Sequence, residues 1–359
     1  MKKHIIILAL VLLNFNSISQ SLSINKVIRL NIHFMLRANG TGNFTETSDG
    51  DGRSWYNGYV YANELIKQMN ERNNWNDSMN IPIGNTTPVL TKNFHYVLDG
   101  VYFIRNDSTF DYGKGYSYYI SNGVNKNNVM NIILNYCPTN DDKCSSSGRS
   151  ASIDNNSKFK CTENRSYWQN YVLQRNSSNP FGWYIDAVAI NTNHELGHLL
   201  GLKHTVQLCK SCVNDFCDDD CFDTPSAWDI MAANNCSKHP ACGWNQNNTP
   251  DCSNNIMDYT NGNALTPCQL TKIHTGLEGG MKTYLVCDAV SYDLTLNDIG
   301  YPKLAYFGKD VTIGSGNSYA NVTNEEKIKL YFSSKVELNN FEIRADSEFE
   351  VFKESACSF

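Results

Sequence analysis

The chain has no excess of basic residues. Its 36 aspartates and glutamates outnumber its 30 lysines and arginines, which gives a formal net charge of -6 over 359 residues. A nucleic-acid-binding surface needs clustered positive charge opposite the phosphates. We therefore expect no nucleic acid partner. The apolar fraction of 41% is ordinary for a globular protein, and the length allows one large domain and a small one.

The sequence also lacks an apolar run long enough to cross a membrane. The run Ile5–Leu13 follows Lys2 and Lys3 and precedes the small residue Ser19. A basic start, a short apolar run and small residues are typical of a signal peptide. Such a run is too short for a transmembrane helix. We expect residues 1–19 to be removed and the mature chain to be secreted, without a membrane anchor.

Cysteine is absent before Cys137, so no thiol lies near the predicted cleavage point to carry a lipid. Seven of the thirteen cysteines fall between Cys209 and Cys252. In an exported chain such a cluster predicts disulfides that hold a long loop together. The odd total leaves at least one cysteine unpaired or intermolecular.

A second interpretation of part of this cluster is a structural zinc site. Its ligands would be four thiols, at Cys209, Cys212, Cys217 and Cys221. Oxidised thiols are the more frequent state in an exported chain, so we favour disulfides.

Two histidines, His194 and His198, are spaced one helical turn apart with Glu195 between them. Residues i and i+4 lie on one face of a helix, so both imidazoles can reach one metal ion. Glu195 then lies beside the metal, where its carboxylate can act as a base on a water held by the ion. Thr192, three residues before Glu195, completes a capping box, so we expect the helix to begin there.

A third imidazole follows at His204. Gly201 can adopt the left-handed conformation that ends a helix, and this turn would bring His204 back towards the same ion. Three neutral imidazoles leave one position open on a tetrahedral Zn²⁺, which is the arrangement of a catalytic site. A bare H-E-x-x-H can occur in a surface helix, but the added glycine and histidine make the pattern much more specific. The sequence predicts a catalytic zinc site.

Two later motifs extend this pattern. They are N-N-I-M-D-Y at Asn254–Tyr259 and D-C-F-D-T-P at Asp220–Pro225. Together with the histidines, the first resembles the methionine turn of the metzincin metalloproteases. Both are similar to the pappalysin branch, including cytophagalysin-type secreted bacterial enzymes. The resemblance covers roughly Val27–Cys287 and implies a secreted zinc endopeptidase that cleaves protein or peptide substrates.

The resemblance also implies roles for single residues. Met257 would form a hydrophobic floor under the imidazoles, although a thioether also suits an ordinary core position. Tyr259 would donate to the oxyanion, or would simply pack. Asp219, Asp223 and Thr224 would hold a structural Ca²⁺, because hard cations bind clustered oxygens; a solvated acidic turn is the alternative.

The chain departs from the family in two respects. Residues 260–263 contain no carboxylate, so a preference for arginine or lysine in the substrate is not implied. Neither an inhibitory pro-segment nor an early cysteine is visible, so latency would need another device. A protease fold retained only for binding, or a zinc hydrolase acting on non-peptide amides, remains the alternative function.

For the fold, the resemblance implies an α/β (α+β) catalytic domain over residues 20–287. Its twisted sheet would lie over the active-site helix, above an irregular, disulfide-rich lower subdomain at 205–287. Residues 288–359, with short alternating runs, predict a small all-β module. We favour a monomer.

Periodicity predicts the individual elements. Val27–Leu36 alternates as a half-buried strand with His33 on its solvated face. The other expected elements are a helix over Tyr59–Arg72 with Ala62, Leu65, Ile66 and Met69 facing the core, a strand over Phe94–Arg105 with a break at Gly100, a strand over Val129–Tyr136, loops and short helix over Pro138–Pro180, a short strand or buried segment over Trp183–Ile190 that leads into the histidine helix, and a helix over Pro267–Leu277.

Overall fold

The computed structural model describes residues 25–50, 54–80, 85–110, 123–136, 148–150, 161–166, 184–205, 219–224, 253–258, 262–296, 299–314, 320–322 and 327–354. The chain divides into two compact units. We call Lys26–Asn70, His95–Leu199 and Met281–Phe359 the sheet unit, and Met1–Asn25, Glu71–Phe94 and Leu200–Gly280 the α8 unit. The signal-peptide region lies outside the described residues.

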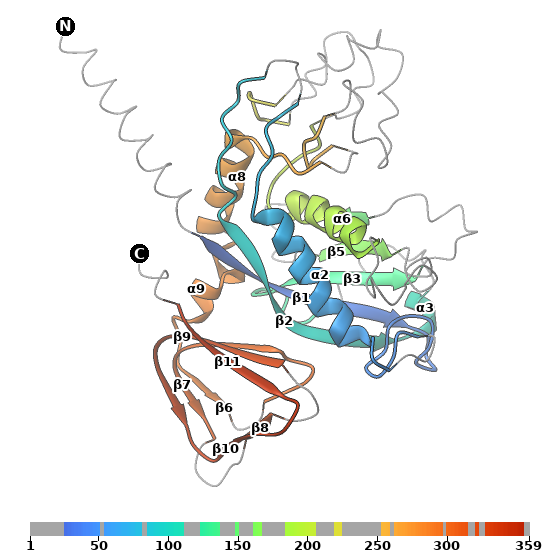
Figure 1. Ribbon diagram of the computed structural model, residues 1–359, viewed down its shortest axis with the longest axis vertical. Coiled ribbons are helices and arrows are strands. Elements are labelled where there is room, and N and C mark those ends of the chain that lie inside the picture. The colour runs from blue at the N-terminus through green and yellow to red at the C-terminus, as the bar shows by residue number, and fades with distance from the viewer. Residues whose placement is uncertain are drawn as a thin grey trace, which may run out of the picture. The chain divides into compact units, whose positions relative to one another are not determined.

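The sheet unit contains a twisted, mainly parallel sheet (Figure 1). Its strands run in the order β2-β1-β3-β5-β4. β3 is parallel to both β1 and β5, whereas β4 is antiparallel to β5. The bounds are β1 Lys26–Leu36, β2 Phe94–Arg105, β3 Met130–Tyr136, β4 Gly148–Ser150 and β5 Cys161–Ser166.

Two predictions about these strands were wrong. β2 continues through Gly100 without the expected break. β4 and β5 lie within Pro138–Pro180, where we predicted loops and short helix. Their sequences, G-R-S and C-T-E-N-R-S, have no apolar alternation to reveal a strand. These strands form because β5 pairs with β3 and β4 pairs with β5, and no local sequence pattern reveals such pairing.

The prediction that His33 is solvated was also wrong, because every residue of β1 is buried. The polar positions of β1 are paired inside the protein. Arg29 binds Asp99, and His33 Nε2 lies 2.7 Å from Oδ1 of Asn131. Burial lowers the pKa of His33 to about 4, so the ring is neutral at physiological pH. Alternation in β1 therefore marks two buried faces, as in other parallel sheets.

The sheet unit contains the helix predicted over Tyr59–Arg72 and a histidine-bearing helix that is longer than predicted. α2 spans Gly58–Asn73, and its four predicted core residues are all buried. The side chain of Asn70 exchanges two hydrogen bonds with the backbone of Tyr96 in β2, at 2.7 and 2.8 Å. α6, Tyr184–Leu199, packs against β4 and β5 (Figure 1). A short α3 covers Asp107–Phe110.

α6 begins at Tyr184, so the predictions of a helix start at Thr192 and a strand over 183–190 were wrong. The buried residues Ile185, Val188 and Ala189 recur at helical spacing and continue to Thr192. The capping box was thus a chance pattern inside a longer helix. Its consequence is that His194 and His198 lie in the second half of α6, where the helix is already established.

The described residues after 290 are mainly β-strands, as predicted. A four-stranded sheet has the order β11-β9-β7-β6, with all its pairings parallel, and β10 pairs with β8. The bounds are β6 Leu294–Leu296, β7 Ala305–Ile313, β8 Ala320–Val322, β9 Lys327–Leu338, β10 Phe341–Ile343 and β11 Glu348–Lys353.

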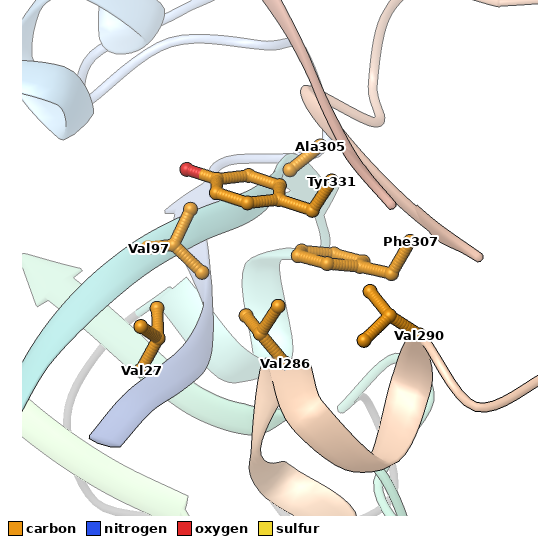
Figure 2. Close-up of a cluster of buried hydrophobic side chains, with 7 residues drawn as sticks. All are labelled: Val27, Val97, Val286, Val290, Ala305, Phe307 and Tyr331. Carbon is orange, nitrogen blue, oxygen red and sulfur yellow. The ribbon is translucent and has the colours of Figure 1, made fainter. Parts of the chain in front are cut away.

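These strands join the sheet through an apolar cluster (Figure 2). It contains residues from β1, β2, the short helix α9 (Val286–Ala289) with Val290 after it, β7 and β9: Val27, Val97, Val286, Val290, Ala305, Phe307 and Tyr331. The segment before β7 also pairs with the outer edge of β2, since Leu304 N donates to Asp99 O at 2.7 Å. The domain boundary after residue 287 stays a prediction.

In the α8 unit, α8 spans Pro267–Glu278, close to the predicted helix. Thr266 caps it and forms a capping box with Gln269, and Pro267 stands in the first turn, where no N–H is needed. A short 3₁₀ turn, η2, follows at Lys282–Tyr284 in the sheet unit. Among the described residues, no helix combines the length and apolar character that a bilayer span requires.

Candidate metal centre

The three predicted histidines come together within the continuous segment 194–204. One ring nitrogen from each of His194, His198 and His204 lies within 4.8 Å of the others, close enough for all three to bind one ion. The rings of His194 and His198 are 4.9 Å apart and perpendicular. His194 is buried, and the other two are half-buried. The group can therefore hold a metal ion, as the sequence predicts.

Helix α6 holds the first two imidazoles and the acid between them. The helix is anchored before them, because Nδ2 of Asn193 donates to the carbonyl of Met69 in α2 at 3.1 Å. Glu195 is buried in the same helix, directly after His194. A carboxylate screened from solvent beside a cluster of imidazoles is suited to proton transfer.

Gly201 makes the turn that leads to the third imidazole. Its φ of +100° lies in the left-handed region, as predicted, and a side chain there would be strained. Just after His204, the amide of Thr205 donates to the carbonyl of Met257 at 3.4 Å. The predicted methionine turn therefore contacts the segment that presents His204. Met257 itself is fully buried.

Asn255 shapes the methionine turn. Its Oδ1 accepts from Met257 N at 2.9 Å, and its Nδ2 donates to Oε1 of Gln269 at 2.8 Å. Gln269 also donates to Asn255 Oδ1 at 3.2 Å, which ties the turn to the first turn of α8. Asn255 belongs to the motif found in the sequence, but its role in the turn and its partner Gln269 were not predicted.

Two further residues near this turn were missed, Lys92 and Asn263, which bond to each other. A signal for Lys92 existed. Leu90, Lys92 and Phe94 alternate into β2 with the buried phase, so Lys92 occupies an inward position. Tyr259, the predicted oxyanion donor, lies outside the described residues, and its role stays a prediction.

The turn with the predicted calcium residues is ordered by hydrogen bonds and a disulfide. Oδ1 of Asp219 accepts from the hydroxyl of Thr224 at 2.8 Å and from the amide of Cys221 at 3.0 Å. Oδ2 of Asp223 accepts from the amide of Cys268 at 2.9 Å. Asp219 and Thr224 are thus in direct contact, while Asp223 faces the start of α8.

Cys221 forms a disulfide with Cys268. This pairing excludes Cys221 from the alternative four-thiol zinc site. It also means that the proximity of Cys221, Asp223 and Cys268 is a covalent staple and not a set of thiolate ligands. Around it, Lys203 and Lys272 pair with Asp220, whose pKa is lowered mainly by the hydrogen bond from Lys203.

Comparisons with known proteins add no relative. No protein-family description matches the chain, and no curated protein matches it significantly.

Proposed function

We propose that the protein is a secreted, zinc-dependent endopeptidase of the metzincin type. The observation that carries the proposal is the convergence of three imidazole nitrogens within 4.8 Å, with the buried Glu195 next to His194 in the sequence of α6. All-nitrogen, three-histidine sites suit Zn²⁺ and leave a position for reaction, whereas structural zinc sites use four protein ligands. The contact of the Met257 turn with Thr205 supports the metzincin comparison.

The residues would divide the work of hydrolysis. When bound, zinc would lower the pKa of water to roughly 7 and polarise the scissile carbonyl. The three imidazoles would hold the ion in place. The Glu195 carboxylate would take a proton from the attacking water and deliver it to the leaving amine. Tyr259 would donate its hydroxyl hydrogen to the carbonyl oxygen as negative charge develops there.

The direct test is proteolysis of an unfolded protein by the purified mature chain, with and without a zinc chelator, alongside metal analysis. We expect one zinc per chain and cleavage that the chelator stops and added zinc restores. Bound zinc without cleavage of protein, but with hydrolysis of small non-peptide amides, would instead identify the alternative hydrolase. Bound zinc with no hydrolysis of either class would support a binding protein and overturn the protease proposal.

Calcium at Asp219, Asp223 and Thr224 is a further part of the proposal. Two carboxylates and a hydroxyl lie within one short turn, and a hard cation prefers such oxygens. The disulfide at Cys221 and the bond from Cys268 N hold the turn in one conformation, which lowers the cost of ion binding. The hydrogen bonds at Asp219 would then compete with the ion for the same oxygen.

Calcium removal is expected to lower the unfolding temperature by a few degrees, about 2–4 °C per kcal/mol lost. The chelator must be too weak to strip zinc. The matched control is Asp223→Asn, which keeps an acceptor for Cys268 N but removes the charge. It should unfold at the same temperature with or without calcium. If calcium removal left the unfolding temperature of the wild-type chain unchanged, hydrogen bonds and the disulfide alone would hold this turn, and the calcium proposal would be wrong.

A further inference from the structure

Lys92 is the only lysine among the largest fully buried side chains that the structure describes. It lies in the α8 unit, two residues before β2, and 1% of its surface is exposed. Buried lysines are rare, because a desolvated ammonium is costly unless its hydrogens are bonded. A lysine buried at such a position therefore needs hydrogen-bond partners inside the protein.

The terminal nitrogen of Lys92 connects two segments far apart in sequence. Nζ donates to Oδ1 of Asn263 at 2.6 Å and to the carbonyl of Arg72 at 3.2 Å. Asn263 in turn donates through Nδ2 to the carbonyls of Arg72 and Trp75, at 3.0 and 3.1 Å. The amide of Asn263 is thus held on both sides, by a donor at its oxygen and by acceptors at its nitrogen.

The backbone of Lys92 is fixed as well. Its carbonyl oxygen lies 2.8 Å from Nε2 of His274, a buried residue of α8. Burial lowers the pKa of Lys92 to about 7, with Asp77 opposing and Arg72 reinforcing the shift. The neutral amine has two hydrogens, enough for its two acceptors.

From Asn263, backbone pairing leads directly to the methionine turn. Ala264 N donates to Asn254 O, and Ile256 N donates to Ala264 O, both at 3.0 Å. The two segments approach so closely at Gly262 that an added Cβ would lie 1.9 Å from Asn254 O. Met257 follows Ile256, and its carbonyl accepts from Thr205, the neighbour of His204. Each link in this path belongs to the α8 unit.

We infer that Lys92 is a positioning residue for the metal centre, acting through Asn263 on the Met257 turn and from there on the segment that carries His204. The inference rests on the proposed zinc site and extends it. Without the Lys92 donor, Oδ1 of Asn263 would be buried without this bond, and the segment 262–264 would lose its attachment at one side. The turn would then hold Thr205 less firmly, and zinc affinity would fall although no ligand is changed.

The test compares the full wild-type chain with Lys92→Met, which keeps a similar shape and removes the donor. Zinc affinity is measured by competition with a chromophoric chelator, and ligand geometry by the visible spectrum of the chain loaded with Co²⁺. We expect zinc to bind about tenfold more weakly, with altered Co²⁺ bands. Leu277→Ala, in α8, is the matched control: it should lower thermal stability while leaving both zinc affinity and the Co²⁺ spectrum unchanged.

The double variant Lys92→Met/Asn263→Leu tests the route. If Lys92 acts through Asn263, the two losses of zinc affinity will not multiply. Should Lys92→Met fail to fold, Asn263→Leu alone tests the same link. Wild-type zinc affinity and an unchanged Co²⁺ spectrum in either single variant would overturn the inference, as would losses that multiply in the double variant. A wild-type chain that binds no zinc would overturn the proposed function itself, so the two failures are distinguishable.

Discussion

Replacing Glu195 by alanine is expected to abolish peptide hydrolysis while zinc stays bound. The three side chains that could hold a metal ion are those of His194, His198 and His204, so loss of Glu195 leaves this group complete. Without the carboxylate, no group in the proposed mechanism takes the proton from water. General acid–base catalysis contributes about 10²–10⁴-fold, and the cleavage rate should fall by at least that factor. Initial rates on an unfolded protein, with zinc content by metal analysis, measure both effects.

Two comparisons isolate the proton-transfer role of Glu195. Glu195→Gln keeps the size of the side chain and its hydrogen-bonding groups but cannot accept the proton, so it should be about as inactive as the alanine variant. Glu64→Ala removes a carboxylate from α2, where Glu64 accepts from Gln68, and should cleave at the wild-type rate. A Glu195→Ala chain that retains a substantial share of activity would show that another group is the base.

Removal of Asp99 is expected to cause a large loss of stability, about 3–5 kcal/mol. Asp99 is buried in β2, and its Oδ2 accepts from Nε and Nη2 of Arg29 in β1, at 2.8 and 2.5 Å. In Asp99→Ala the Arg29 guanidinium would be left buried without its carboxylate, with the ammonium of Lys303 close to the same site. Denaturant unfolding of the variant and the wild-type chain measures the difference.

The same pair also contacts the C-terminal strands, through Arg29. The Arg29 guanidinium stacks over the ring of Phe307 at 4.4 Å, and Phe307 belongs to the apolar cluster shown in Figure 2. The matched control is the double variant Arg29→Met/Asp99→Leu. It removes both charges and should recover much of the loss, because apolar pairs can replace buried ion pairs. A loss below about 1 kcal/mol in Asp99→Ala, the value of an exposed pair, would contradict this account.

Local sequence patterns correctly predicted the features that are set by residues only a few positions apart. The buried face of α2 followed from its helical spacing, and the helix predicted from Pro267 begins at that residue in α8. The positions of His194, His198 and His204 also followed from local geometry. One helix and one glycine turn bring all three together, so spacing alone was informative.

Local sequence failed to predict features that depend on a partner far away in the sequence, and these became visible only in the tertiary structure. The capping pattern at 192–195 does not start a helix, because α6 already begins at Tyr184 and its first turns are held by buried residues. His33 can be buried because its ring Nε2 hydrogen-bonds to Oδ1 of Asn131, nearly a hundred residues later in the sequence. The pairing of Cys221 with Cys268, outside the dense cysteine cluster, could not be read from spacing.

Local sequence pattern thus identified the three histidines that come together as a possible metal site, and several of the elements around them. The tertiary structure decided what supports that group, through Lys92 and Asn263, Asn255 and Gln269, and Thr205 with Met257. The physical reason is the range of each interaction. Helical spacing and a left-handed glycine act over a few residues, whereas the energy of a buried hydrogen bond depends on a partner that only the folded chain brings within reach.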